Sequence, residues 1–489
     1  MKKKYTAAGS LHFLQVGEDA YIGWNRFWPS IFILNEEALA LLERIEQGQP
    51  IELNEEIEYY LKEFQQYRFI YAGAVDLSTE NFAAMVRRKV EEPRLRAEKF
   101  YRDKEAYDEL KIVNDECNLA CSYCVNRHGR DVRKGINQKF CGGAGGGFSK
   151  EPPARRRQEN KLKIALQCVD AYFARKIKNK SEQAKIFFNG GEILLEWQLI
   201  KEIVGHISKE YAVRGIEIQY EINTNLTLLT EEIAGFLKKH NFKVHISIDG
   251  YGAAHDRTRK YFNGRGSFAD IIEKLKIYRK YHGEESLPTF QGTIENPELF
   301  DPGEVYKMEQ YGFFQARLAP NLLGASEADA RRKAALMGEF LELNSRQPFK
   351  VTEQLFTRLK NKINMEEYEF SFNCPGLCAL PGLGIEINLS TRKLSHLCGF
   401  VEKAGLPLEE LGGDIYNPRL WEVSEAFIEE RMESLLANCM ECELVGICAG
   451  GCILSGLDSS NKLNKAACAY QKEMWKIYVE KAYNDIKRV

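Results

Sequence analysis

The chain contains the segment Asn114-Asp-Glu-Cys117-Asn-Leu-Ala-Cys121-Ser-Tyr-Cys124, from which the other assignments in its 489 residues follow. The three cysteines are separated by three and by two residues, directly after an apolar run (110–113) that predicts a buried strand. Three thiolates on one tight loop can hold three irons of a four-iron cluster and leave the fourth iron open. A structural zinc site is the alternative, but it needs a fourth ligand, for which only His128 lies nearby. The spacing therefore favours an iron–sulfur cluster with one open position.

Beyond this loop the strand and helix patterns alternate, which predicts a β/α architecture. The expected strands cover residues 110–113, 185–189, 217–223, 243–248, 288–294 and 314–318. The expected helices cover residues 162–176, 197–211, 230–240, 268–281 and approximately 302–311. Because ligands bind at the carboxyl ends of parallel strands, polar residues at these ends are candidate site residues.

Three strand ends carry such residues. The first is Gly190-Gly191-Glu192, where two glycines let the backbone approach a ligand closely and the glutamate can pair with a cation. The second is Thr224-Asn225-Leu226, and the third is Ser247-Ile-Asp249-Gly250. Each segment alone could be an ordinary turn, whereas three at successive strand ends predict one binding site.

Together with Tyr123, which directly precedes the third cysteine, these segments resemble the signature of the radical S-adenosylmethionine (SAM) enzymes. The resemblance implies an α/β core that is an open, partial (β/α)6 barrel. It also implies that the open iron of the cluster at Cys117, Cys121 and Cys124 chelates SAM, which an electron then cleaves to a 5′-deoxyadenosyl radical. The implied SAM-binding residues are Tyr123, Gly190, Gly191, Glu192, Thr224, Asn225, Ser247 and Asp249. Leu226 departs from the family pattern, which has glycine at that position.

Between the cysteine loop and the first predicted helix lies a basic, glycine-rich stretch, residues 128–161, without apolar periodicity. This composition predicts a flexible insertion, which is either a lid or clamp for an acidic peptide or a solvated, disordered loop. Cys141 within it is interpreted as an incidental free thiol. Cys168 on the following helix is interpreted as a small buried hydrophobe.

Eight of the thirteen cysteines lie in the last quarter of the chain. Clustered cysteines in a reducing compartment indicate metal, and eight thiolates are enough for two closed four-iron clusters. The spacing Cys-x2-Cys-x5-Cys-x3-Cys resembles the SPASM extension of radical SAM enzymes, and it does not suit paired zinc ribbons. The resemblance implies a nearer cluster on Cys374, Cys378, Cys398 and Cys452, and an outer cluster on Cys439, Cys442, Cys448 and Cys468. If Cys374 or Cys378 is not a ligand, the nearer cluster keeps an open iron.

The first 95 residues contain no cysteine and predict a winged-helix-like module. Strands are expected at 11–16, 20–24, 30–34 and 69–71, and helices at 38–47, 54–67 and 79–90, with Asn35 as an N-cap. DNA binding is the alternative, but the second helix opens with three glutamates instead of a basic surface. In front of a radical SAM core the module resembles the precursor-peptide recognition domain of peptide maturases, in which a leader peptide adds a strand to the sheet edge.

The composition limits the partners and the location. A net charge of −2 argues against a general binder of nucleic acid or membranes, and no apolar run reaches transmembrane length. No signal-peptide core follows the basic start, so we expect a cytoplasmic protein. The expected domains are 1–95 (recognition module), 96–325 (core), 326–373 (bridging helices) and 374–489 (SPASM domain), and residues 91–109 could be helix or linker.

This organisation resembles that of a radical SAM/SPASM maturase of ribosomally made peptides. It implies three [4Fe–4S] clusters, SAM, a precursor peptide and an electron donor such as flavodoxin or ferredoxin, and a product with a thioether, ether or carbon–carbon cross-link. A maturase of a protein substrate, such as a sulfatase activator, is the alternative within the superfamily. An electron-transfer protein is the alternative outside it, but such a protein has no use for Gly190-Gly191-Glu192. No residue stands out as a general base.

Overall fold

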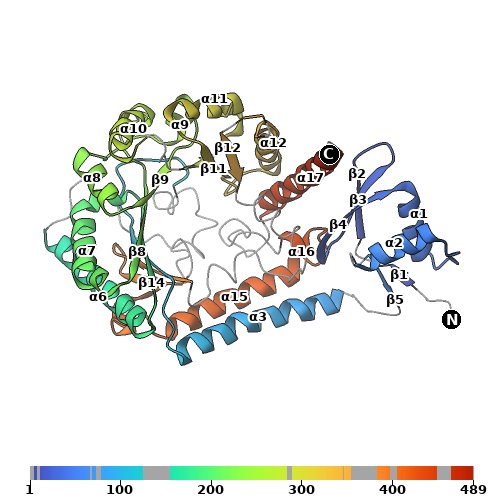
Figure 1. The fold of residues 1–489 in the computed structure, drawn as a ribbon, viewed down its shortest axis with the longest axis horizontal. Helices are drawn as coiled ribbons and strands as arrows, with labels where there is room; N and C mark the ends of the chain where they lie inside the picture. The colour runs from blue at the N-terminus through green and yellow to red at the C-terminus, as the bar shows by residue number, and fades with distance from the viewer. Residues whose placement is uncertain are drawn as a thin grey trace.

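The computed structural model describes residues 5–7, 11–66, 69–72, 79–124, 155–283, 289–344, 346–347, 349–353, 383–396, 405–448 and 464–487. Figure 1 shows an outer ring of helices around a curved sheet, with a smaller unit beside it that contains the N-terminal strands. In this part of the chain, no helix combines the length and the apolar character that crossing a bilayer requires.

Six parallel strands form the centre of the molecule. They are β6 (Glu109–Asn114), β7 (Gln183–Gly190), β8 (Glu217–Thr224), β9 (Lys243–Ser247), β10 (Phe290–Ile294) and β11 (Gln315–Pro320). Each pairs in parallel with the next along the chain, which confirms the six strands expected from the alternating pattern. Their carboxyl ends therefore meet at one edge of the sheet, where the candidate residues lie.

Four short strands extend this sheet. They are β12 (Lys350–Glu353), β13 (Gly384–Asn388), β14 (Lys393–Ser395) and β15 (Gly405–Pro407), and the full order is β12-β11-β10-β9-β8-β7-β6-β13-β14-β15. β12 pairs in parallel with β11, so residues 350–353 form a strand within the segment predicted to be largely helical. β13 pairs in parallel with β6, although it lies in the predicted C-terminal domain. Strands this short carry too few alternations to be predicted by periodicity.

Helices cover the outer face of the sheet (Figure 1). They are α6 (Arg155–Lys178), α7 (Trp197–Glu210), α8 (Glu231–Lys239), α9 (Ala253–Thr258), α10 (Phe268–His282), α11 (Pro302–Tyr306) and α12 (Glu327–Leu343). The strand residues that face these helices are apolar and fully buried, among them Ile112, Phe188 and Ile222. The alternate residues, such as Asn189 and Asn223, are half-buried on the inner face. The sheet therefore presents its polar face to the interior of the ring.

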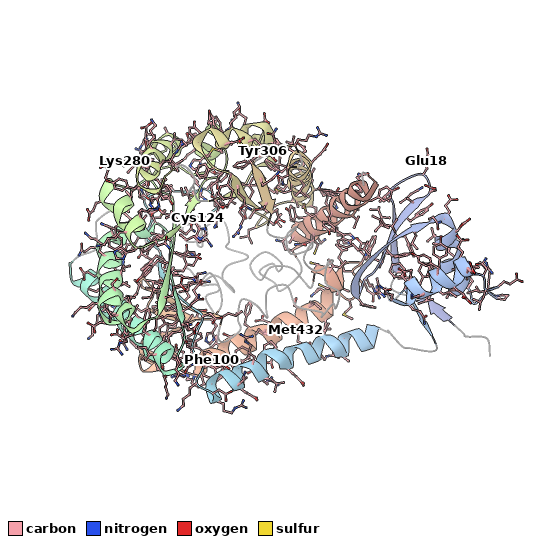
Figure 2. All side chains as sticks on the ribbon, in the orientation of Figure 1. Glu18, Phe100, Cys124, Lys280, Tyr306 and Met432 are labelled. Carbon is pink, nitrogen blue, oxygen red and sulfur yellow. The ribbon has the colours of Figure 1, made fainter. Side chains whose placement is uncertain are left out.

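Two long helices, α3 (Thr79–Arg102) and α15 (Arg419–Asn438), run side by side (Figure 1). The predicted helix continues past residue 90 to Arg102, so most of the undecided segment is helical. Arg94 of α3 forms ion pairs with Glu425 and Glu429 of α15. Figure 2 labels one buried residue on each helix, Phe100 and Met432. The chain ends with α16 (Val445–Cys448) and α17 (Lys465–Lys487).

The N-terminal unit contains a three-stranded antiparallel sheet and a two-stranded ribbon. Its elements are β1 (Tyr5–Ala7), β2 (Leu11–Gln15), β3 (Ala20–Asn25), β4 (Trp28–Asn35), β5 (Ile70–Ala72), α1 (Glu36–Glu46) and α2 (Glu55–Gln66). The sheet has the order β2-β3-β4, and the ribbon pairs β1 with β5. The side chain of Asn35 accepts a hydrogen bond from the Ala38 backbone N–H at 2.8 Å, which confirms the predicted N-cap.

The hairpin of β3 and β4 packs against the cysteine-rich segment near the C-terminus. The Trp24 indole N–H donates to the Glu443 carbonyl at 3.1 Å. The Gly446 N–H donates to the Arg26 carbonyl at 2.7 Å, and a Cβ at Gly446 would lie only 2.5 Å from the Phe27 carbonyl oxygen. Apolar residues complete the contact, namely Ala20, Ile22, Trp24, Leu444, Ile447, Trp475 and Val479. The first strands and the last helices thus share one small core.

Candidate active site

The cysteine loop leaves β6 at Asn114 and reaches the inner side of the ring of helices, where Figure 2 labels Cys124. Cys121 is buried, and Cys117 and Cys124 are half-buried. The backbone at the end of α9 and just after it accepts hydrogen bonds from this loop, as a neighbouring strand would. The Ala120 N–H donates to the Lys260 carbonyl at 2.5 Å, and the Ser122 N–H donates to the Thr258 carbonyl at 2.9 Å. The loop is therefore anchored on a second element as well as on its own strand.

The chemistry of the three thiols fits an iron cluster. Burial raises the pKa of Cys117 to about 12 and that of Cys121 to about 11, so thiolates here require an added positive charge, which bound iron supplies. Among the described residues, no three His, Cys, Asp or Glu side chains come close enough to hold one metal ion. A four-iron cluster binds each thiolate through a different iron and does not need such convergence. The zinc alternative rested on His128, which lies outside the described residues.

Gly190 and Gly191 place the end of β7 directly against this loop. The Gly191 N–H donates to the Asn114 carbonyl at 2.6 Å, and the Glu192 N–H donates to the Glu116 carbonyl at 2.8 Å. Gly190 has φ +129°, and a Cβ there would lie 2.0 Å from the Asn114 carbonyl oxygen. A Cβ on Gly191 would lie 2.3 Å from the Glu116 carbonyl oxygen. The two glycines are predicted to let the backbone approach a ligand, and in the structure they also admit the backbone of the cysteine loop.

Glu192 is fully buried at the centre of the site. Its Oε1 accepts from the Leu194 N–H at 3.0 Å and from the Thr224 hydroxyl at 2.8 Å, and its Oε2 accepts from the Asn225 N–H at 2.6 Å. Burial raises the pKa of Glu192 to about 7, and these hydrogen bonds limit the rise. Two predicted strand ends thus meet at one carboxylate, which retains acceptor capacity on Oε2.

The end of β8 connects Glu192 to the cysteine loop. The Asn225 amide donates to Asn118 Oδ1 at 2.9 Å and lies 4.0 Å from the sulfur of Cys117. Leu226, at the position where the family has glycine, is fully buried and has φ +65°. This left-handed conformation costs a leucine about 1–3 kcal/mol and costs glycine almost nothing.

Ser247 and Asp249 take different roles at the end of β9. Ser247 lies on the inner face, where its hydroxyl donates to Asn223 Oδ1 at 3.3 Å. Asp249 is fully buried, and both its oxygens already have protein partners. These partners are the Tyr123 hydroxyl (2.6 Å), the Thr258 hydroxyl (2.8 Å), the Thr293 N–H (2.8 Å) and Arg259 Nε (3.0 Å). Tyr123 and Asp249 are therefore in contact, and both carboxylate oxygens of Asp249 bind groups of the protein.

Lys161 is a site residue that the sequence analysis missed. Its ammonium lies 3.0 Å from Asn114 Oδ1 and 2.5 Å from Glu196 Oε1, and the residue is buried. The predicted insertion, residues 128–161, included Lys161, but its residues 155–161 belong to α6, and its residues 128–154 lie outside the described residues. The first residues of α6 are mostly basic and polar, so they lack the apolar periodicity by which a helix is predicted. This buried lysine therefore holds Asn114, the residue at which the cysteine loop leaves β6.

The inner face also carries polar residues that alternation along the strands could have identified. On β8 and β9, Glu221 Oε2 lies 2.9 Å from His245 Nε2, and on β11 the side chain of Arg317 is exposed. Burial lowers the pKa of His245, and Glu221 opposes this effect. These residues lie on the inner face of the sheet beside Ser247.

The C-terminal cysteines are described only in part. Cys439 is buried, and Cys442, Cys448 and Cys468 are half-buried. The other four predicted ligands, Cys374, Cys378, Cys398 and Cys452, lie outside the described residues, as does Cys141. Cys168 is fully buried on α6, which confirms its interpretation as a core residue.

The sequence of the core matches a known family. Residues 112–294 match the family model of the Radical SAM superfamily. An uncharacterized protein of Methanocaldococcus jannaschii is 33% identical over 175 residues, which are 35% of this chain and 48% of that protein. The cysteine-type anaerobic sulfatase-maturating enzyme of Clostridium novyi is 26% identical over 207 residues, or 42% of this chain and 49% of that enzyme. The chain thus spans about half the length of these two relatives.

A third relative aligns with more of the chain. The radical SAM cyclopropyl synthase TigE of Paramaledivibacter caminithermalis is 22% identical over 394 residues, which are 76% of this chain and 74% of that enzyme. Among solved structures, native anSMEcpe with bound AdoMet matches with a TM-score of 0.55 and 19% identity, covering 78% of this chain and 99% of that chain. The same protein with AdoMet and the Cp18Cys peptide matches with a TM-score of 0.53. At these identities the structural matches establish a shared fold.

Proposed function

Because this chain contains a radical SAM domain at residues 112–294, we propose that it cleaves SAM reductively and installs an oxidative intramolecular cross-link in a ribosomally synthesised precursor peptide. The observation that carries this proposal is the convergence of the cysteine loop, Gly190-Gly191-Glu192 and Asn225 at one buried carboxylate. The similarity to TigE along three quarters of both chains supports the choice of a peptide-modifying enzyme.

In this proposal Cys117, Cys121 and Cys124 hold a [4Fe–4S] cluster. When bound, the cluster supplies the electron that cleaves SAM, and the resulting radical removes a hydrogen atom from the peptide. Glu192 Oε2 accepts from the amino group of SAM, and Ser247 on the inner face contacts its ribose. The polar inner face of the sheet positions the peptide beside SAM.

We assign two further [4Fe–4S] clusters to the eight C-terminal cysteines. When bound there, such clusters would supply an acceptor for the electron that remains after hydrogen abstraction and closure of the cross-link, or an open iron on the nearer one would supply a site for a substrate thiolate. An external flavodoxin or ferredoxin supplies the first electron. The protein positions these groups, and the cofactors carry the chemistry.

The N-terminal unit binds the leader of the precursor in this proposal. Among the residues that the structure describes, β2 and β4 each pair only with β3, so both offer an outer edge to which a strand can be added. A docked leader raises the effective concentration of the peptide core at the cluster.

A protein-modifying enzyme of the sulfatase-maturating type is the second candidate. The similarity to the Clostridium novyi enzyme and the fold shared with anSMEcpe favour it. However, about a fifth of this chain has no counterpart in the anSMEcpe structure, which leaves room for an additional peptide-binding unit.

The two candidates are separated by one anaerobic experiment. The protein is reconstituted with iron and sulfide, reduced and supplied with SAM, and 5′-deoxyadenosine is quantified with small peptides encoded by adjacent genes and with a sulfatase-derived peptide. A cross-linking maturase gives more nucleoside with one small peptide, and that peptide loses the mass of two hydrogens. Formylglycine in the sulfatase peptide establishes the second candidate, and no nucleoside from fully iron-loaded protein rules out both.

The pKa of Glu192 predicts how SAM binding depends on pH. Between about pH 8 and about pH 6 we expect the affinity for SAM to fall about tenfold, because the carboxyl titrates near pH 7 and its ionised form is the stronger acceptor. Anaerobic titration calorimetry of the reconstituted protein measures this change. The Glu192→Gln variant should bind SAM weakly and with a smaller pH dependence; an equal slope in both proteins contradicts the assignment.

A further inference from the structure

The three-stranded sheet of the N-terminal unit is covered on both faces. One face, with Tyr21 and Leu34, packs on the helices α1 and α2 of the same unit. The other face, with Ala20, Ile22 and Trp24, packs on α17 and on the cysteine segment, which comprises residues 439–448. Figure 1 shows β3 and β4 between α1 on one side and α16 and α17 on the other. A segment from the far end of the chain therefore completes this sheet.

Two of the proposed cluster ligands take part in this contact. Cys442 and Cys448 are half-buried and pack against the same apolar cluster that contains Trp24. The indole N–H of Trp24 donates to the carbonyl of Glu443, the residue after Cys442, at 3.1 Å. A displacement of either cysteine therefore displaces residues that pack on the hairpin of β3 and β4.

The cysteine segment fits an iron–sulfur cluster in the same way as the cysteine loop of the core. The Leu444 N–H donates to the sulfur of Cys442 at 3.5 Å, and the Leu119 N–H donates to the sulfur of Cys117 at 3.4 Å. In both places the backbone N–H two residues after the cysteine points at its sulfur. Such a donor favours the thiolate, which is the form that binds iron.

Short turns hold the cysteine segment together. α15 ends at Asn438, and α16 contains four residues. Between them the Cys442 N–H donates to the Cys439 carbonyl at 2.9 Å, and the Val445 N–H donates to the Cys442 carbonyl at 3.1 Å. A helix of one turn is unstable by itself in water, because nucleation is costly. Metal binding to such a segment supplies the free energy that orders it.

We propose that the outer cluster and the N-terminal sheet form one cooperative unit, so that the sheet is fully ordered only in a chain whose outer cluster is bound. The inference rests on the proposed function and deepens it, because it makes the edges that receive the precursor depend on the metal. Coupling between two sites is reciprocal, so a docked peptide strand also stabilises the outer cluster. An enzyme without its outer cluster then binds the precursor weakly.

Hydrogen–deuterium exchange of the full chain, measured anaerobically by mass spectrometry, tests this coupling without a peptide. In wild-type protein we expect residues 20–27 to exchange at least about tenfold more slowly after reconstitution with iron and sulfide than in the metal-free state. Residues 197–210 of α7, which lie in the core, should change by less than about twofold.

Two cysteine variants identify the cluster that is responsible. Reconstituted Cys442→Ala should exchange residues 20–27 at the metal-free rate, because it lacks a ligand of the outer cluster. Cys117→Ala is the matched control, since it lacks a ligand of the SAM-binding cluster and should keep the slow exchange. Slow exchange in Cys117→Ala together with fast exchange in Cys442→Ala supports the proposal.

Three results overturn it. They are equal exchange of residues 20–27 in metal-free and reconstituted wild type, an equal change in α7, and fast exchange in Cys117→Ala. If Cys442→Ala does not fold, the comparison of the wild type with Cys117→Ala decides. Iron content tests the cluster assignment separately: Cys442→Ala should hold about four iron atoms fewer per chain than the wild type, and equal iron in both would contradict the proposed function.

Discussion

Replacing Cys117 by alanine is expected to abolish the cleavage of SAM. The variant retains two of the three thiols of the loop, Cys121 and Cys124, so the cluster loses a ligand and does not hold SAM productively. We expect 5′-deoxyadenosine to fall by more than about 10⁴-fold, which is within the range of rate enhancement that enzymes supply. Chromatographic quantification of the nucleoside after anaerobic reconstitution measures the effect.

Cys168→Ala is the matched control, because Cys168 is also buried but lies on α6 within the apolar core. This change removes one sulfur atom and should cost about 1 kcal/mol of stability while leaving the nucleoside yield close to that of the wild type. Substantial SAM cleavage by Cys117→Ala would show that this cysteine does not hold the cluster.

Gly190→Ala should have the second largest effect. Its Cβ would lie 2.0 Å from the Asn114 carbonyl oxygen, which is backbone and cannot rotate away, and the residue has φ +129°. We expect a loss of about 2–5 kcal/mol in the free energy of unfolding, together with loss of iron from the SAM-binding cluster, because the cysteine loop must move. Denaturant unfolding of the apoprotein and iron per chain after reconstitution measure the two effects.

Gly205→Ala supplies the comparison. Gly205 lies within α7, and a Cβ there would meet nothing within 4 Å. In a helix this change should raise stability by up to about 1 kcal/mol and should leave the iron content unchanged. If both glycine variants unfold at the same denaturant concentration, the close packing of β7 on the cysteine loop is wrong.

Strands and helix caps could be predicted from the sequence alone, because each depends on residues that are neighbours along the chain. Phe188 and Ile222 are fully buried beneath the helices, so the strands that contain them can be predicted from a few consecutive apolar residues. The cap at Asn35 likewise depends on near neighbours, because its side chain accepts from the N–H of Ala38. Strand order then followed from the preference for sequential parallel neighbours.

The contacts that complete the site depend on residues far apart in the chain. The Ser122 N–H donates to the Thr258 carbonyl at 2.9 Å across 136 positions, and the Ser390 hydroxyl donates to Asn114 Oδ1 at 3.1 Å across 276 positions. No periodicity or spacing connects such pairs, and Lys161 was concealed by a run of basic residues. Gly190 and Gly191 remain predicted SAM-binding residues, and their contact with the carbonyl groups of the cysteine loop becomes visible only in the structure.

The contact between the N-terminal hairpin and the cysteine segment also determines when this protein can finish folding during its synthesis. Trp24 and Leu444 share one apolar cluster, yet 420 positions separate them. At about 5–20 residues per second, a ribosome reaches Leu444 roughly 20–90 s after Trp24. The apolar face of Ala20, Ile22 and Trp24 lacks its native partner throughout that interval. A nascent chain that stalls before this point therefore exposes this face, however well its core has formed.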